Sequence, residues 1–252
     1  MRKATLLVAL AATVIIFGVS CDTLTDLAKP TVTATAILNG AQLRLEWTAV
    51  TDADGYRIKA GDSTWTTTGT SFDVEVPAAK VEVIAYSGSD ESDPAVINCE
   101  VEETATLEVY GISDPDTTHR SSFGFNTDGT ITTYSIKTAN YPSMDFYMED
   151  VQLAMSIVNS GDKGWNAKGN AAKEAALTSY DDVVVADAPG TGYSTQEAIA
   201  SGAVYYLWID RMNDGWDVSD HFAKAKVISI QGAKVTMKIG YQTIGGLRWV
   251  VN

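Results

Sequence analysis

Apolar and polar positions alternate in short runs along most of the chain beyond residue 30. In Leu43-Arg44-Leu45-Glu46-Trp47, the apolar residues would lie on one face of a strand and the charged residues on the other, because successive strand side chains point to opposite faces. Asparagine–glycine or aspartate–glycine pairs separate several of these runs, which is typical of tight hairpins. The pattern therefore predicts an all-β chain.

The alternation is most regular in residues 30–101. The runs predict strands at 31–38, 43–47, 56–60, 71–76 and 80–86. Asn39-Gly40 lies between the first two runs and predicts a hairpin turn. About seven short strands without a helical pattern are typical of a small β-sandwich.

Part of this region resembles a known family. The segments 45–48, 53–58 and 81–86 resemble strands B, C and F of fibronectin type III domains. The chain departs from that family at Val81, where a tyrosine usually braces a corner of the sandwich. The resemblance implies that Trp47 and Tyr56 are core residues, and that residues 30–101 act as a spacer or a protein-binding module.

A second strand-rich region begins at about residue 104. Its apolar runs predict strands at 106–111, 122–126, 130–137, 144–147, 152–158, 182–186, 203–209, 222–230, 234–244 and 247–251. We also predict one or two short helices. The first covers Ala171–Leu177, which consists of good helix formers, and the second begins at Ser194, where Glu197 completes a capping box. We expect residues 104–252 to form a larger, mostly antiparallel β domain.

The second region has a resemblance of its own. The segments 148–155, 204–210, 221–227 and 240–246 resemble HmuY-like lipoproteins. The resemblance implies a ligand-binding β domain, and its best-known members hold haem iron through two histidines or two methionines. The candidate haem ligands here are His119, His221, Met155 and Met212, although residues 120–220, where the family supplies its ligands, contain no histidine. Met155 lies in an apolar strand and is expected to be a core residue, and Met212 lies in a polar turn.

The start of the chain predicts export. A basic segment, Met1-Arg2-Lys3, is followed by an apolar run and by small residues before Cys21, which are the marks of a signal peptide over residues 1–20. The residues before Cys21 resemble a lipobox, although Gly18 replaces the usual aliphatic residue. The resemblance implies that acyl chains on Cys21 anchor the protein in the cell envelope, at the outer membrane or cell surface. Residues 21–29 would then form a tether. An ordinary signal peptide is the alternative, and the apolar run is shorter than the ~20 residues that span a bilayer.

The amino-acid composition and net charge limit the classes of partner that the protein is expected to bind. The chain is 45% hydrophobic and 20% charged with a net charge of −14, which is typical of a globular and acidic protein. Such a chain is a poor candidate for binding nucleic acid, because phosphate contacts need clustered lysine and arginine. Acidity would also oppose binding to anionic lipid, so membrane attachment would come from acyl chains. If Cys21 is acylated, Cys99 has no partner, and its apolar run predicts a buried, inert thiol.

Aromatic residues in predicted loops are candidate ligand-binding residues. Trp165, Tyr193 and Trp216 each lie in a polar, glycine-bearing segment. The loop around Trp216 also carries Asp210, Asp214, Asp217 and Asp220. Carboxylates beside an exposed ring can bind sugars, so these residues predict a ligand rim. The alternative is that each ring folds back and closes one end of a sheet.

Metal binding and catalysis find little support in the sequence. His119 follows two aspartates, but a zinc site needs about four nitrogen or sulfur ligands and a calcium site needs more oxygens. No serine lies in a nucleophile-elbow pattern, and Pro189-Gly190-Thr191-Gly192 has no following lysine to reach a phosphate. The sequence does not decide whether two carboxylates are paired for glycoside hydrolysis, because the distance between them is not visible in a sequence. We therefore expect a protein that is not an enzyme and has no assigned metal.

Three functional hypotheses follow. The first is a lipid-anchored envelope binding protein whose second domain presents loops to a ligand, with haem as the specific version. The second is a structural or adhesion component of the envelope that contacts other proteins. The third is a surface lipoprotein that binds carbohydrate through Trp165, Tyr193 and Trp216. Fold resemblance alone does not choose among them.

Overall fold

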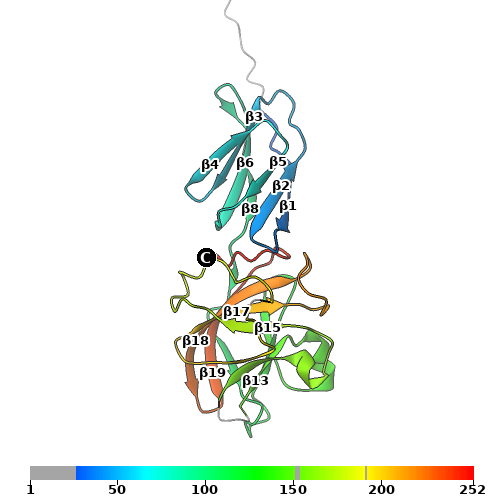
Figure 1. Cartoon of the computed structure of the whole chain (residues 1–252), viewed down its shortest axis with the longest axis vertical. Coiled ribbons are helices and arrows are strands. Elements are labelled where there is room, and N and C mark those ends of the chain that lie inside the picture. The colour runs from blue at the N-terminus through cyan, green and yellow to red at the C-terminus, as the bar shows by residue number, and fades with distance from the viewer. Residues whose placement is uncertain (1–26, 151–153, 191) are drawn as a thin grey trace, which may run out of the picture.

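The computed structural model describes residues 27–150, 154–190 and 192–252, which are nearly all β (Figure 1). This confirms the predicted fold class. The predicted signal peptide and Cys21 lie outside the described residues. No helix within the described ranges is long and apolar enough to cross a membrane.

The first body of the chain is built from two antiparallel sheets. One sheet has the order β1 (Val32–Ile37), β2 (Gln42–Trp47) and β5 (Ser71–Val74). The other contains β4 (Ser63–Thr67), β3 (Gly55–Ala60), β6 (Lys80–Ser87), β7 (Asp90–Glu91) and β8 (Ala95–Asn98). We call residues 27–101 the N-terminal body. As predicted, the apolar residues of β2 are buried and its charged residues are exposed.

Trp47 and Tyr56 are core residues of this body, as predicted. They are only 6% and 4% exposed, and their ring centroids lie 5.2 Å apart. The predicted hairpin at Asn39-Gly40 is also present, because β1 and β2 pair up to Ile37 and Gln42. Strand β4 was not predicted; its residues are polar apart from one tryptophan, so the apolar alternation is weak there.

The second body, residues 102–252, also has two main sheets. One has the order β10 (Leu107–Tyr110), β19 (Lys234–Tyr241), β18 (His221–Gln231), β17 (Val204–Ile209) and β15 (Ala171–Glu174), with β9 (Glu102–Glu103) beside β19. The other has the order β12 (Ile131–Tyr134), β11 (Ser122–Phe125), β13 (Phe146–Glu149), β14 (Ser156–Asn159) and β16 (Gln196–Ala198). Their facing side chains share one apolar core. We call this part the C-terminal body.

The helix predictions were wrong in position. Ala171–Glu174 is strand β15, because it pairs with β17 from Ala171↔Trp208 to Glu174↔Tyr205, and this tertiary pairing overrides helix propensity. The Ser194 hydroxyl accepts a hydrogen bond from Gln196 N (3.2 Å). The chain then continues as strand β16 (Gln196–Ala198), so no helix begins at Ser194 and no capping box forms. The short helices are 3₁₀ turns instead, η1 (Thr138–Ser143) and η2 (Ser160–Lys163).

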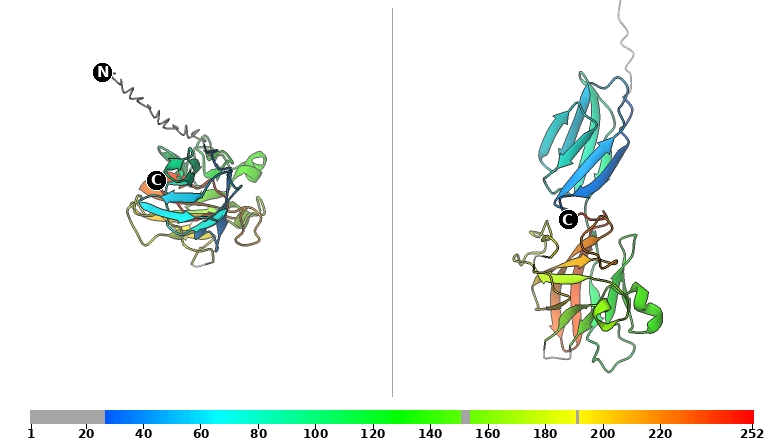
Figure 2. Two further views of the ribbon diagram at one scale, coloured as in Figure 1. Left: turned by 90° about the horizontal axis from the view of Figure 1, so that it is seen from above. Right: turned by 45° about the vertical axis from the view of Figure 1, so that its right-hand side comes forward.

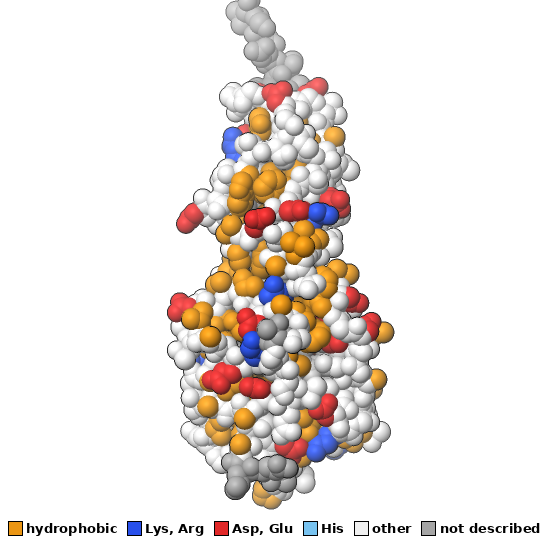
Figure 3. All heavy atoms as spheres, viewed as in Figure 1, with side chains coloured by type: hydrophobic (Ala, Val, Ile, Leu, Met, Phe, Trp, Pro, Cys, Tyr) orange, Lys and Arg blue, Asp and Glu red, His pale blue; other side chains and the backbone are white. Residues whose placement is uncertain are grey.

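The last residues of the chain join the two bodies. Leu247 and Trp249 are fully buried in the core of the N-terminal body, and Trp249 Nε1 donates to Ala41 O (3.0 Å). The predicted strands at 182–186 and 247–251 make only the isolated bridge Val185↔Trp249. The two bodies stack end to end with the C-terminus at their junction (Figures 1 and 2). Figure 3 shows apolar side chains gathered around this junction.

Gly40, in the first hairpin, lies where another segment of the backbone passes very close, which explains why this residue is a glycine. Gly40 has a φ of +79°, and a Cβ there would lie 2.1 Å from Gly246 O. Arg248 N also donates to Gly40 O (3.0 Å). The Asn39-Gly40 turn therefore forms the hairpin and also lets the end of the chain pass beside it.

Candidate functional site

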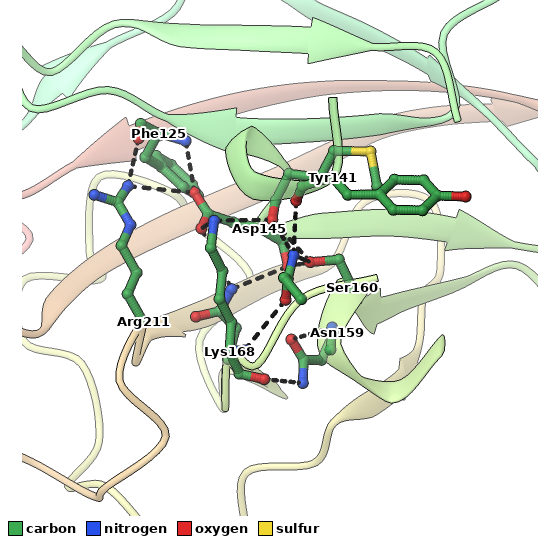
Figure 4. Close-up of polar contacts among 11 residues, drawn as sticks. Phe125, Tyr141, Asp145, Asn159, Ser160, Lys168 and Arg211 are labelled. Carbon is green, nitrogen blue, oxygen red and sulfur yellow. Dashed lines mark hydrogen bonds and ion pairs between the residues drawn. The ribbon is translucent and has the colours of Figure 1, made fainter. Parts of the chain in front are cut away.

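A buried carboxylate organises the most polar part of the C-terminal body. Asp145 is fully buried just before β13, and its Oδ2 accepts a hydrogen bond from Phe125 N (2.8 Å) (Figure 4). Lys168 Nζ lies 2.8 Å from Oδ1, and Arg211 Nη2 lies 3.3 Å from Oδ2. The site thus joins the turn before β13, the segment before β15 and the loop after β17.

The neighbouring glycine makes room for this arrangement. Gly124 lies in β11 beside the turn that carries Asp145, and a Cβ on Gly124 would lie 1.9 Å from Ser143 O and 3.3 Å from Asp145 Oδ2. A larger residue would displace the backbone of that turn. The Phe125 amide and the Asp145 carboxylate can therefore meet because residue 124 has no side chain.

Three polar side chains hold the backbone around Asp145. Ser160 Oγ donates to Met144 O (2.8 Å), and Asn166 Nδ2 donates to Ser160 Oγ (2.8 Å). The amide of Asn170, which is fully buried, donates to Asp145 O (3.0 Å). Buried polar groups with partners of this kind fix a single local geometry. The network thereby positions the segment that carries Lys168.

Lys168 and Arg211 face a hollow on the surface above Asp145. Lys168 Nζ donates to Met144 O (3.0 Å) as well as to Asp145, and Arg211 Nη2 donates to Phe125 O. The side chains of Lys168 and Arg211 are 11% and 29% exposed, whereas Asp145 is covered. Two cations and one carboxylate leave the cluster with one excess positive charge.

The cations line two adjoining hollows. The first has a volume of about 300 Å³ and is lined by Asn126, Thr127, Ser143, Lys168 and Arg211 among others. The second has a volume of about 330 Å³ and is lined by Asn159, Asp162, Asn166, Lys168, Thr195 and Asn213 among others. Because Lys168 belongs to both, we treat them as one groove and call it the Lys168 groove. Its hydroxyls and cations can donate hydrogen bonds to a polar ligand, whereas the side-chain amides of Asn126, Asn159 and Asn166 already donate to protein acceptors.

The loop after β17 contributes Arg211 and Asn213 to this groove. Asp210 is 2% exposed, and its carboxylate accepts from Asn213 N (2.5 Å) and Gly215 N (3.2 Å). At the other end of the loop, Asp220 is fully buried and accepts from Trp208 Nε1 (2.9 Å). Burial raises the pKa of Asp220 to about 6, and its Oδ1 has no partner within the described residues. Two buried carboxylates therefore flank the loop that presents Arg211.

The three predicted aromatic residues separate into two places. Trp165 is half-buried and stacks on Tyr141 with centroids 5.3 Å apart, beside the groove residue Asn166. Tyr193 donates to Asp187 O (3.2 Å), and burial raises the pKa of its hydroxyl. Trp216 donates to Gly246 O (3.2 Å) and packs against the same apolar cluster as Tyr193. Tyr193 and Trp216 thus fold back onto the body, and the ring of Trp165 packs against Tyr141 and Tyr147 without lining either hollow of the groove.

The candidate haem histidines lie at opposite ends of a sheet. His119 stacks on Tyr110 with centroids 3.7 Å apart, and Tyr110 pairs with Lys234 at the start of β19. His221 contacts Tyr241 at the other end of this eight-residue strand. At ~3.3 Å per residue, the two histidines are separated by roughly 20 Å and cannot bind one iron.

The remaining candidate ligands have other surroundings. His221 Nδ1 lies 3.0 Å from Gln242 O, and burial lowers its pKa, which favours the neutral ring. Met155 is 8% exposed in the apolar core, as predicted, whereas Met212 is 68% exposed. Across the described part of the chain, no group of three or more His, Cys, Asp or Glu side chains is placed to hold a metal ion.

Sequence analysis did not find the groove. Asp145, Lys168 and Arg211 are widely spaced in the chain and match no motif. One signal was present: Asp145 stands alone between Met144 and Phe146, at a position where an uncompensated charge would be costly to bury. The position of Asp145 between two apolar residues indicates that its charge has a partner in the fold, but it does not show which residue that partner is.

Comparison with known proteins does not identify the chain. No protein-family model matches it, and no curated protein matches it. A DUF4466 family protein from Parabacteroides merdae is similar over 86% of this chain and 98% of its own, at 8% identity and a TM-score of 0.43. A chitinase from Bacillus thuringiensis is similar over 89% of this chain and 27% of its own, at 13% identity and a TM-score of 0.23. Similarities this low carry no functional argument, and the resemblances to fibronectin type III and HmuY-like proteins stay predictions.

Proposed function

We propose that this protein is a non-catalytic binding protein of the bacterial cell envelope, anchored through Cys21, which binds a polar ligand in the Lys168 groove. One observation carries the proposal: two cations and several amides and hydroxyls from five separate segments converge on this groove. A buried network holds them in place without a ligand. Such preorganisation lowers the free-energy cost of binding.

A binding role fits the groove better than a catalytic one. Asp145 is the carboxylate nearest to both cations, yet it is fully buried beneath them and already accepts four hydrogen bonds or ion pairs. A general acid or base must reach the proton that it transfers. Asp145 instead acts as a fixed counter-charge that orients Lys168 and Arg211.

Haem is not part of the proposal. The four candidate ligands do not converge on one place, since His119 and His221 lie at opposite ends of β19 and Met155 is a core residue. Carbohydrate is the better ligand class, because hydroxyl and amide side chains line the Lys168 groove.

The binding proposal is tested with the mature chain, residues 22–252, and an array of soluble glycans. Ligands that bind should shift the amide resonances of the Lys168 groove, and Asn126→Ala or Thr195→Ala should weaken binding about threefold to tenfold, as expected for one lost hydrogen bond. Thr33→Ala, on β1 of the N-terminal body, is the matched control and should change nothing. Binding that shifts only residues outside the groove would contradict the proposal.

The anchoring proposal is tested in cells. Wild-type protein should incorporate a labelled fatty acid and fractionate with membranes, whereas Cys21→Ser should do neither, because a thiol is required for acylation. Release of unlabelled wild-type protein in soluble form would instead support an ordinary signal peptide.

A structural or adhesion role is the second candidate. The observation that favours it is the junction, where buried Leu247 and Trp249 fix the two bodies end to end. A stiff spacer of this kind suits a protein that holds a partner away from a surface. Cross-linking in intact cells tests this candidate, which predicts a recurrent envelope-protein partner that the Asn126→Ala variant retains although its glycan binding is weakened.

A further inference from the structure

We infer that the ligand of the Lys168 groove is an acidic glycan, and that Lys168 and Arg211 bind its carboxylate. The inference rests on the proposed function and specifies the chemistry of its ligand. It arises from the charge of the groove, from the unused donors of Arg211 and from the way in which Asp145 fixes both cations.

The charge of the first hollow is opposite to that of the protein. The chain has a net charge of −14, but the side chains that line this hollow include Lys168 and Arg211 and no carboxylate. Charges in the rest of the protein are screened over ~8 Å at physiological ionic strength, so nearby cations determine what binds there. A neutral ligand would form hydrogen bonds with the two cations but no ion pair, so an anion gains more from them.

Arg211 retains donors for a ligand. A guanidinium has five N–H donors, and within the described residues only Nη2 of Arg211 has acceptors, namely Phe125 O and Asp145 Oδ2. Its Nε is buried without a partner, which leaves Nη1 as the group free to reach a bound anion. Arginine binds carboxylates well because its planar donors match the two oxygens.

Lys168, like Arg211, is fixed by contacts within the protein and retains a donor for a ligand. Two of the three donors on its ammonium group are directed at Met144 O and Asp145 Oδ1. The remaining donor can reach a ligand in either hollow, since Lys168 lines both. A carboxylate between Lys168 and Arg211 would give two positive and two negative groups, so the ligand would complete the charge balance of the cluster.

The polar rim fits the rest of a sugar. Thr127 and Ser143 line the hollow that contains Arg211, and Asp162 and Thr195 line the adjoining one. Hydroxyl groups both donate and accept, and a carboxylate accepts, which matches vicinal sugar hydroxyls. A chain of uronic acid residues could therefore place one carboxylate at the cations and its hydroxyls along the rim.

The test compares oligogalacturonate with a neutral galactose oligomer of equal length, by calorimetry on the mature chain. We expect the acidic oligomer to bind at least tenfold more tightly and to lose affinity as salt increases. Equal binding of both oligomers in the groove would overturn the inference and leave the proposed function intact. Binding of no glycan in a wider array would count against both.

Variants locate the carboxylate. Arg211→Gln and Lys168→Gln should each reduce affinity for the acidic oligomer tenfold or more while changing affinity for a neutral one less than twofold. Lys234→Gln, which removes a partly exposed lysine paired with Glu108 at the far end of β19, should have no effect. If either groove variant fails to fold, the amide resonances of the wild type that the acidic oligomer shifts still decide the question: shifts in the Lys168 groove support the inference, and shifts confined to other residues overturn it.

Discussion

The two bodies of the molecule bury different kinds of residue. Among buried polar or charged residues in the described part of the chain, only Ser92 lies in the N-terminal body, and the others lie in the C-terminal body. Both bodies are antiparallel and of similar strand length, so the sheet pattern alone does not distinguish them. The difference indicates that the alternation of apolar and polar residues specifies the N-terminal body. The C-terminal body also needs a particular set of polar contacts, and this is where a ligand site can form.

The largest effect is expected from Trp249→Ala, which would break the connection between the bodies. Trp249 is fully buried in the core of the N-terminal body, and its indole donates to Ala41 O. Removing such a ring from a core costs about 3–5 kcal/mol. Denaturant unfolding measures the loss, with Leu38→Ala at an exposed site as the control. An unchanged free energy of unfolding would show that the tail is not part of that core.

Asp145→Asn would sharpen the contrast between buried and exposed charges. It leaves Lys168 and Arg211 partly buried without their counter-charge, and we expect a loss of about 3 kcal/mol in the free energy of unfolding. The comparison variant is Asp73→Asn, which breaks an exposed pair with Arg44 in the N-terminal body. It should have no measurable effect, because exposed pairs contribute little. Equal losses in the two variants would contradict this distinction.

The pH dependence of stability should also come from the C-terminal body. Because the pKa of Asp220 is raised to about 6, the folded protein binds a proton there between about pH 4 and pH 6 that the unfolded chain releases. The free energy of unfolding therefore decreases as pH rises through this window, by about 2–3 kcal/mol. Above pH 6 the loss is complete.

Asp220→Asn isolates this contribution. His221, whose pKa is lowered by burial, acts in the opposite direction, since its protonation destabilises the fold as pH falls below the ordinary histidine range. The difference between wild type and Asp220→Asn removes the histidine contribution, because both proteins retain His221. Parallel stability curves from pH 4 to pH 7 would rule out a raised pKa at Asp220.

The smallest effect concerns Cys99, which is buried at the end of the N-terminal body. It is fully buried, and desolvation raises the pKa of its thiol to about 12, so little thiolate exists at neutral pH. We expect no alkylation by iodoacetamide in native residues 22–252, whose one cysteine is Cys99, and one modified cysteine after they are unfolded. Mass spectrometry measures both. Rapid labelling of the native protein would show that the junction opens.

The sequence predicted most strands but not the site. Period-2 runs such as 43–47 are read directly, because burial on one face is a local property of the chain. Ala171–Glu174 was mistaken for a helix because its strand character comes from pairing with β17, far along the chain. The groove depends on contacts of the same long range, such as Lys168 with Asp145 and Arg211 with Phe125. Residue type and spacing do not encode such contacts.

The tail at the junction also sets the order in which the chain can finish folding. The strands of the N-terminal body are synthesised long before Leu247 and Trp249, which complete their core. The N-terminal body therefore stays incompletely packed until residues 247–249 have been made. Closing this contact joins residues far apart in the chain, such as Trp249 and Ala41, which is entropically costly and slow. Emergence of this late segment, rather than of the N-terminal strands, should commit the chain to its native state.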